Sequence, residues 1–266
     1  MEYLPLVSII TIVFNGEKHI EDTIKSVIDQ TYHNIEFIII DGGSTDNTIP
    51  IIGKYAHAIT SFLSEQDEGI SDAFNKGLKL AKGEIIGIIN ADDWYEKNAI
   101  EKAVKNIRNA DIVYGNLRLW KGDKPDFIVT ADHSFLENEM SVNHPTVFIK
   151  KACYDQFGLF NREYKCAMDY DLMLRLKINN CRFVYIPEVL ANMRWEGFSD
   201  ANWLMGCRET RTIKSNYLPA SRSRNQLYFY KHVLGITVPR FLIKIRMGFL
   251  VKLYRSRLAR IKKVYG

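Results

Sequence analysis

The sequence predicts an α/β protein with a doubly wound, mostly parallel sheet, followed by a basic helical extension. Apolar runs rich in β-branched residues alternate with segments whose apolar residues recur every three or four positions. This alternation favours right-handed crossovers and helices on both faces of the sheet. Acidic residues stop at Glu209, whereas basic residues continue to the end of the chain. We therefore expect an α/β domain over residues 1–209 and a separate extension over 210–266.

The first part of the chain contains four predicted strands. Residues 7–14 (VSIITIVF) form a nearly continuous apolar run, which is typical of a strand buried on both faces. The same reasoning places further strands at 35–40, near 58–63 and at 84–90. Helices are expected over 20–28 and 71–81, the second of which ends at Gly83, a favourable residue after a helix. Together these elements give the parallel half of the sheet.

The pattern is mixed in the second part. A strand is expected at 112–114, and a hairpin over 117–129 that turns at Lys121-Gly122-Asp123. Another strand is expected at 146–149. Apolar residues spaced for one side of a helix predict a helix over 169–178.

The net charge of +5 conceals an uneven distribution. Residues 1–209 carry 22 Lys and Arg against 31 Asp and Glu, a net charge of −9. Residues 210–266 carry 14 Lys and Arg and no acidic residue. A basic segment of this kind needs an anionic partner, such as phospholipid or nucleic acid, or acidic groups within its own domain.

The end of the basic segment predicts an amphipathic helix over 240–263. A membrane-spanning helix is not expected, because Lys244 and Arg246 interrupt the apolar stretch. One interpretation is a helix lying on the anionic inner face of a membrane. The alternative is a C-terminal helical pair packed on the catalytic domain. Nucleic-acid binding is not expected, because no recognised binding motif accompanies the charge.

Cysteine usage and the N-terminus indicate a cytoplasmic protein. The four cysteines have neither CxxC nor zinc-finger spacing, so we expect reduced thiols (Cys153, Cys166, Cys181 and Cys207). The first residues, MEYLP, lack the basic start and separate apolar segment of a secretory signal.

Polar groups follow three of the predicted strands. They are 11–17 after the first strand, 41–46 after the second and Asp92-Asp93 after the fourth. Ligands of open parallel sheets bind beyond the carboxyl ends of the strands, so these groups should converge there. Neither GxGxxG nor GxxxxGK[ST] occurs, which argues against a Rossmann dinucleotide site or a P-loop.

Four stretches, in this order and spacing, carry a family resemblance: SIITIVFNGEKHI (8–20), IDGGSTDNT (40–48), SEQDEGISDAFNKGLKLAKGEIIGIINADD (64–93) and AMDYDLMLRL (167–176). The chain resembles a family 2 glycosyltransferase with a GT-A fold, similar to bacterial enzymes of O-antigen, capsule and exopolysaccharide assembly. The resemblance spans about residues 5–200. It divides the catalytic domain into a nucleotide-sugar half, about 1–93, and an acceptor half, about 94–209.

The resemblance implies a donor site and a divalent cation, Mn²⁺ or Mg²⁺. Asp93 would bind the cation, and Asp92 would approach the ribose and the cation. Asp41 would accept a hydrogen bond from the uracil ring. The other implied donor-site residues are Thr11, Phe14, Asn15, Glu17, Gly43, Ser44, Asp67, Asp72, Lys76 and Asn90.

The acceptor half carries the implied catalytic base. Asp169 matches the second acid of the family's Glu-Asp motif, although Met168 precedes it here, and Asp171 is the alternative. A carboxylate at this place would take the proton of the attacking acceptor hydroxyl. His144 would lie in the same region and touch the cation or the acceptor. Residues 194–199, including Arg194, Trp195 and Ser199, resemble a loop that closes over the donor.

These implications combine into one function. The chain is expected to be an inverting hexosyltransferase that moves a glucose-, galactose- or N-acetylglucosamine-type sugar from a UDP-sugar to a glycan hydroxyl. The acceptor would be linked to a polyprenyl diphosphate, and the protein would be peripheral on the inner membrane. Two alternatives are a sugar nucleotidyltransferase and a non-catalytic membrane-associated scaffold.

Overall fold

The first four strands form the parallel half of the sheet. In the computed structural model, which describes residues 4–194 and 202–244, β1 (Val7–Val13) lies between β2 (Ile35–Asp41) and β4 (Ile85–Ile88). Strand β3 (Ser61–Ser64) pairs with β2 at the edge. The prediction placed this strand three residues too early, because Ala56–Ala58 form a 3-10 turn and Thr60 is the first residue to bond to Phe37.

The second half of the sheet is mixed in direction. Its strands are β5 (Trp94–Tyr95), β6 (Ile112–Lys121), β7 (Lys124–Val129), β8 (Phe148–Lys150) and β9 (Phe183–Arg194). The sheet order is β3-β2-β1-β4-β8-β6-β9-β5, with β7 paired to β6. The hairpin is confirmed, but its first strand is continuous with the strand expected at 112–114. The strand expected at 146–149 begins at Phe148, because His144–Thr146 form a 3-10 turn, η3.

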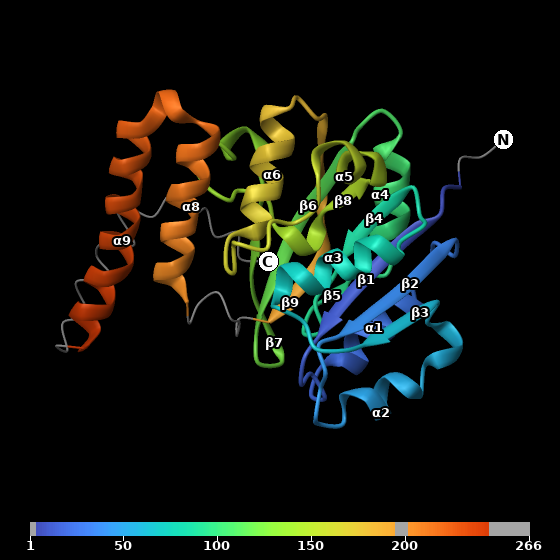
Figure 1. Ribbon diagram of the computed structural model, residues 1–266. Helices are drawn as coiled ribbons and strands as arrows, with labels where there is room; N and C mark the ends of the chain where they lie inside the picture. The colour runs from blue at the N-terminus through green and yellow to red at the C-terminus, as the bar shows by residue number, and fades with distance from the viewer. Residues whose placement is uncertain (1–3, 195–201, 245–266) are drawn as a thin grey trace.

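Helices cover both faces of the sheet (Figure 1). On one face lie α1 (Ile20–Ile28), α2 (Thr48–Gly53) and α4 (Ala99–Ile107). On the other lie α3 (Ile70–Leu80), α5 (Lys151–Phe157) and α6 (Met168–Ile178). Gly77 lets α3 approach β1 closely, because a Cβ there would stand 2.4 Å from Cγ2 of Ile10. Two apolar cores therefore enclose the sheet, as the buried strand runs predict.

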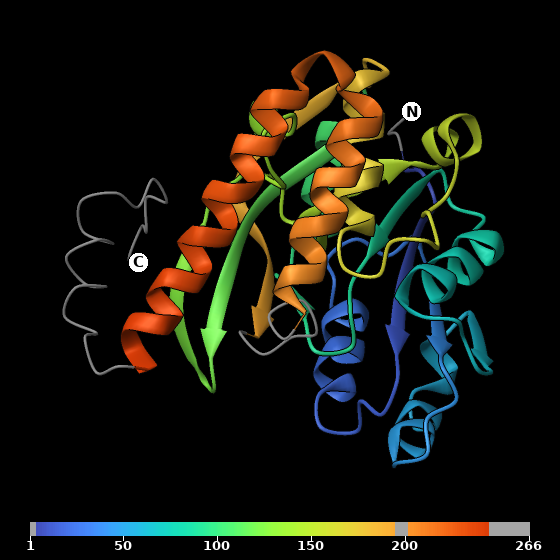
Figure 2. The same ribbon diagram turned by 60° about the vertical axis from the view of Figure 1, so that its left-hand side comes forward.

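A helical pair follows the sheet. Helix α8 (Trp203–Tyr217) and the long helix α9 (Arg222–Lys244) are joined by the 3-10 turn η4 (Pro219–Ser221) and lie side by side in both views (Figures 1 and 2). Helix α8 lies between α9 and α6. The change of composition at residue 210 falls inside α8.

The basic extension is only partly described. The helix expected over 240–263 overlaps α9 as far as Lys244, and the rest of it lies outside the described residues. None of the helices in the described ranges combines the length and the apolar character needed to cross a bilayer. Over residues 203–244, α8 and α9 form a helical pair.

Candidate functional site

The loops after β1 and β2 are tied together, as their position at neighbouring strand ends predicts. Asn15 has a left-handed backbone, with φ of 50°; its N–H donates to Oγ of Ser44 at 2.8 Å, and its Oδ1 accepts from N–H of Thr45 at 2.9 Å. Two residues on, Oε2 of Glu17 accepts from the backbone and the side chain of Asn47 at 2.9 and 2.8 Å. Asn15 and Glu17 thus hold the two loops together. Phe14 beside them is 64 % exposed.

Asp41 lies at the end of β2 and is fully buried. Its carboxylate accepts hydrogen bonds from N–H of Gly43 at 3.1 Å, from N–H and Oγ of Ser44, and from Oγ of Ser64 at 2.7 Å. In this arrangement Asp41 shapes the turn after β2. Oδ2 accepts three of these bonds, and Oδ1 accepts the one from Oγ of Ser44. Thr11, inside β1, is also fully buried.

A third polar segment reaches the same loops from β3. Gly42 has no side chain, and Oδ2 of Asp67 stands 2.4 Å from where its Cβ would be. The other oxygen, Oδ1 of Asp67, accepts from N–H of Gly69 at 2.9 Å, just before α3. Asp67 therefore lies against the turn that Asp41 shapes.

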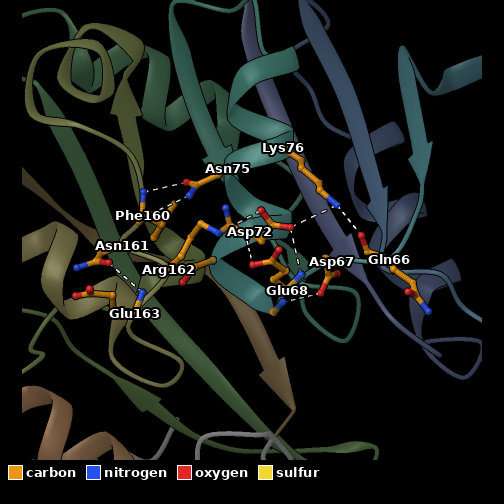
Figure 3. Close-up of polar contacts among 12 residues, drawn as sticks. Gln66, Asp67, Glu68, Asp72, Asn75, Lys76, Phe160, Asn161, Arg162 and Glu163 are labelled. Atoms are coloured by element: carbon orange, nitrogen blue, oxygen red, sulfur yellow. Dashed lines mark hydrogen bonds and ion pairs between the residues drawn. The ribbon is translucent and has the colours of Figure 1, made fainter.

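Helix α3 begins with a charged group (Figure 3). Nζ of Lys76 lies 2.8 Å from Oε1 of Glu65 and 3.4 Å from Oδ2 of Asp72. Asp72 also faces Arg162, whose Nε lies 3.5 Å from Oδ1 of Asp72, and Arg162 forms a second ion pair with Glu68. The predicted residues Asp72 and Lys76 are therefore paired with each other. Sequence reasoning missed Arg162, which no motif marked.

Strand β4 ends at Ile88, earlier than the expected end at residue 90, and Asp92 and Asp93 lie in the turn that connects it to β5. Asp93 is 1 % exposed, and its Oδ1 has no hydrogen-bond partner among the described residues. Burial raises the pKa of Asp93 well above its usual value, and the charge of Asp92 adds to the rise. Burial also raises the pKa of Asp92. Oδ1 of Asn90, beside them, is likewise buried without a partner in the described ranges.

Arg194, at the end of β9, lies beside this pair. Its Nη1 donates to the backbone oxygen of Asp92 at 2.7 Å, and its Nη2 lies 2.6 Å from Oδ2 of Asp22. The guanidinium stands over the ring of Trp94, 4.5 Å from its centre. Arg194 thus reaches the backbone of the acidic pair. Trp195 and Ser199 lie outside the described residues.

The segment before α6 is anchored to α3. The side chain of Asn75 makes two hydrogen bonds to the backbone of Phe160. Nδ2 of Asn75 donates to the carbonyl oxygen of Phe160 at 2.8 Å, and the N–H of Phe160 donates to Oδ1 of Asn75 at 3.0 Å. Oγ of Ser71 donates to the carbonyl oxygen of Tyr164 at 3.1 Å. Both anchors are buried. They connect the donor half with the segment that carries Asp169.

Asp169 lies in the first turn of α6. Burial raises its pKa to about 6, and its Oδ1 accepts from N–H of Tyr170 at 2.7 Å. The alternative, Asp171, is 2 % exposed, accepts from the hydroxyl of Tyr217 at 3.0 Å and lies 3.3 Å from Nη2 of Arg175. Asp171 is therefore occupied by contacts within the fold, and Asp169 is the better placed of the two to act as a base.

His144 lies in apolar surroundings. Its ring centre is 5.5 Å from that of Phe74 and 5.9 Å from that of Phe160. Burial lowers its pKa to about 4, so the ring is neutral at neutral pH. Within residues 4–194 and 202–244, no three His, Cys, Asp or Glu side chains are grouped to hold a metal ion.

The carboxylates nevertheless fit a cation that is shared with a ligand. Mg²⁺ is commonly bound through one or two carboxylates, with substrate phosphates and water completing the shell. Asp92 and Asp93 provide such a pair, and the unpartnered oxygen of Asp93 is a free ligand atom. A dication beside them would offset the cost of ionising two buried neighbouring acids.

Comparison with known proteins agrees with this architecture. Residues 8–168 match the family described as glycosyl transferase family 2. An uncharacterized glycosyltransferase of Rickettsia typhi is 32% identical over 208 residues, which cover 72% of this chain and 64% of that protein. The chondroitin synthase of Escherichia coli is 30% identical over 188 residues, 66% of this chain and 27% of the synthase. The chain thus spans less than two thirds of either relative.

Solved structures share the fold at low sequence identity. The Staphylococcus aureus protein TarS (residues 1–349), in complex with UDP-GlcNAc, has a TM-score of 0.68 at 19% identity and covers 86% of this chain and 73% of that one. The mannosyltransferase PcManGT of Pyrobaculum calidifontis, in complex with GDP-Man and Mn²⁺, has a TM-score of 0.64 at 16% identity and covers 96% and 82%. From the matched residues and the shared architecture, the chain belongs to glycosyl transferase family 2 and has the GT-A fold.

Proposed function

We propose that this protein is an inverting hexosyltransferase that uses a UDP-sugar. The observation that carries the proposal is the buried carboxylate of Asp93 in the turn between β4 and β5, one oxygen of which has no donor within the described ranges. The loop after β1 approaches this turn, since a Cβ on Gly16 would stand 3.5 Å from Cβ of Ala91, and it is tied to the loop of Asp41, against which Asp67 lies. Ligands of open α/β sheets bind beyond such strand ends.

Asp93, with Asp92 beside it, would hold Mn²⁺ or Mg²⁺. Such a cation, when bound, neutralises the charge that develops on a departing diphosphate. His144 is left out of this ligand set, because it packs between Phe74 and Phe160. Arg194 adds a fixed positive charge next to the pair.

Asp169 would act as the general base. The acceptor oxygen attacks the anomeric carbon from the face opposite the diphosphate, while Asp169 takes the hydroxyl proton. The bond between the anomeric carbon and the phosphate oxygen breaks, and UDP leaves with the electron pair, so the anomeric configuration inverts. A pKa of about 6 leaves Asp169 ionised at neutral pH and close to the value at which a base is most effective.

The test is a transfer assay with a panel of UDP- and GDP-sugars, Mn²⁺ or Mg²⁺, and a short polyprenyl-diphosphate-linked glycan. We expect UDP release that depends on the acceptor, and a product with inverted anomeric configuration. Asp169→Asn should lose transfer by about a thousandfold or more while still binding donor. Asp29→Asn is the control, because Asp29 is an exposed acid just after the C-terminal end of α1. Full transfer by Asp169→Asn would refute the mechanism.

We also propose that the enzyme docks on an anionic membrane through α9. The residues on its outward side are large, apolar and 47–62 % exposed: Leu227, Tyr230, Leu234, Val238 and Phe241. Their spacing of three and four residues places them on one stripe of the helix. The opposite side packs inward, where Asn225 is 1 % exposed and Tyr228 contacts Lys214.

Charge selects lipid over a second copy of the chain as the occupant of this stripe. Lys231 and Arg224 lie along one border of it and Lys244 along the other, at helical spacing. Residues 210–266 contain no acid, so two such helices would repel each other. An apolar stripe bordered by bases is the pattern of a helix that lies in an anionic interface.

Liposome flotation tests this docking. Leu234→Glu should reduce binding to phosphatidylglycerol vesicles several-fold, and binding should weaken with salt. Ile49→Glu on α2, which is 37 % exposed and lies far from α9, is the matched control (Figure 1). Equal flotation of Leu234→Glu and the wild type would refute the proposal, as would a dimer that Leu234→Glu dissociates.

A further inference from the structure

Glu209 on α8 holds the segment that precedes Asp169. Its Oε1 accepts from N–H of Lys165 at 3.0 Å, and its Oε2 accepts from the N–H groups of Cys166 and Ala167, both at 2.9 Å. One carboxylate thus binds three consecutive backbone amides. Hydrogen bonds to an ionised acceptor are roughly twice as strong as neutral ones.

These amides stand at the beginning of α6, where helices need partners. Ala167 is the N-cap residue of α6, and its side chain cannot accept a hydrogen bond. Glu209, from a different helix, accepts from the N–H of Ala167 and of the two residues before it, and its negative charge lies at the end of α6 that the helix dipole favours. Helix α8 also lies close here, since a Cβ on Gly206 would stand 3.5 Å from Cβ of Cys166.

Resting on the proposed role of Asp169, we propose that Glu209 is a positioning residue that sets the place and the proton affinity of the catalytic base. Asp169 follows Ala167 by two residues, so a shift of the held amides moves its carboxylate. Displacing a reacting group by about 1 Å can lower the rate on the order of a hundredfold. The anchors at Asn75 and Ser71 hold the same segment from α3.

The charge of Glu209 also acts on Asp169. Burial is the largest cause of the raised pKa of Asp169; amide hydrogen bonds oppose it, and the carboxylate of Glu209 adds to it. Cys166 is the other titratable group beside both acids, and burial raises the pKa of its thiol. A neutral residue at 209 should therefore lower the pKa of Asp169 and move the acid limb of the rate profile to lower pH.

The test compares three variants of the full chain in the transfer assay. Glu209→Gln should lower kcat about 10- to 100-fold, leave the donor KM within about threefold, and shift the acid limb to lower pH. Glu209→Asp keeps the charge, so its acid limb should stay in place even where its rate falls. Glu163→Gln removes a charge from an exposed residue of the same segment and should behave like the wild type. Thermal unfolding checks that each variant is folded.

Hydrogen exchange gives a readout that is independent of catalysis. The amides of 165–167 should exchange faster in Glu209→Gln and at the wild-type rate in Glu163→Gln. The proposal would be overturned if Glu209→Gln kept the wild-type kcat, the wild-type acid limb of the rate profile and the wild-type exchange of the 165–167 amides. It would also be overturned if Glu209→Gln lost rate through a raised KM while the acid limb stayed in place. Full transfer by Asp169→Asn would instead refute the role of Asp169 as the catalytic base. The amide exchange of 165–167 would still report separately on whether Glu209 holds this segment.

Discussion

Asn75→Ala removes one of the buried connections between α3 and the segment before α6. Asn75 is 7 % exposed, and its amide pairs with both backbone groups of Phe160, at 2.8 and 3.0 Å. Truncation leaves a buried N–H and a buried carbonyl without partners, at about 1–3 kcal/mol for each. We expect a loss of about 3 kcal/mol in the free energy of unfolding, and a melting temperature lower by about 6–12 °C.

The assay is thermal and urea unfolding followed by circular dichroism, with transfer measured below the transition. Asn75→Asp keeps the acceptor for N–H of Phe160 but places a carboxylate oxygen against its carbonyl, so it should be no more stable than Asn75→Ala. Asn106→Ala, on the exposed side of α4, should change stability by less than about 0.5 kcal/mol. A melting temperature of Asn75→Ala within about 2 °C of the wild type would refute the reasoning.

Three further predictions follow from the site and from α8. Asp93→Asn should weaken the binding of UDP in the presence of Mn²⁺ by about tenfold or more in calorimetric titration, and undiminished affinity would remove Asp93 from the ligand set. The pKa of Asp169 is raised to about 6 and a base must be ionised, so kcat should fall on the acid side with a midpoint near pH 6. A kcat that stays constant down to pH 5 would exclude Asp169 as the base. Burial lowers the pKa of Lys214 from 10.5 to about 8. At a pH between these two values, Lys214 is therefore more protonated in the unfolded chain than in the folded one. The stability of the wild type relative to Lys214→Met should therefore rise from pH 7 to pH 9.5 in urea unfolding, and a constant difference would contradict this.

The strands of the parallel half could be predicted because each is an apolar run bounded by turn residues. Ile9, Ile10 and Ile38 are fully buried, as strands covered on both faces require. The boundaries of β3 and β8 could not be predicted, because 3-10 turns at 56–58 and 144–146 precede them. Such turns are set by local hydrogen bonds rather than by the period of the apolar residues.

The meeting of the loops at the strand ends could likewise be predicted, since parallel topology alone places 14–17 beside 41–48. Which partner each polar side chain finds could not. Asp41 is bound by Ser64 from β3, and Arg162 reaches Asp72 across 90 residues of sequence. Glu209 belongs to none of the sequence motifs, because a carboxylate that binds backbone amides needs no particular neighbour in the sequence.

The contact between α8 and the start of α6 bears on where this chain can be shortened. The abrupt change in charge invites truncation after residue 209, which would retain Glu209 but discard Thr210–Tyr217, the helical turns that hold it in place. The same cut would also delete Tyr217, the partner of Asp171. A shortened chain should therefore keep the whole of α8 and end no earlier than Ser221, at the close of the turn that follows it.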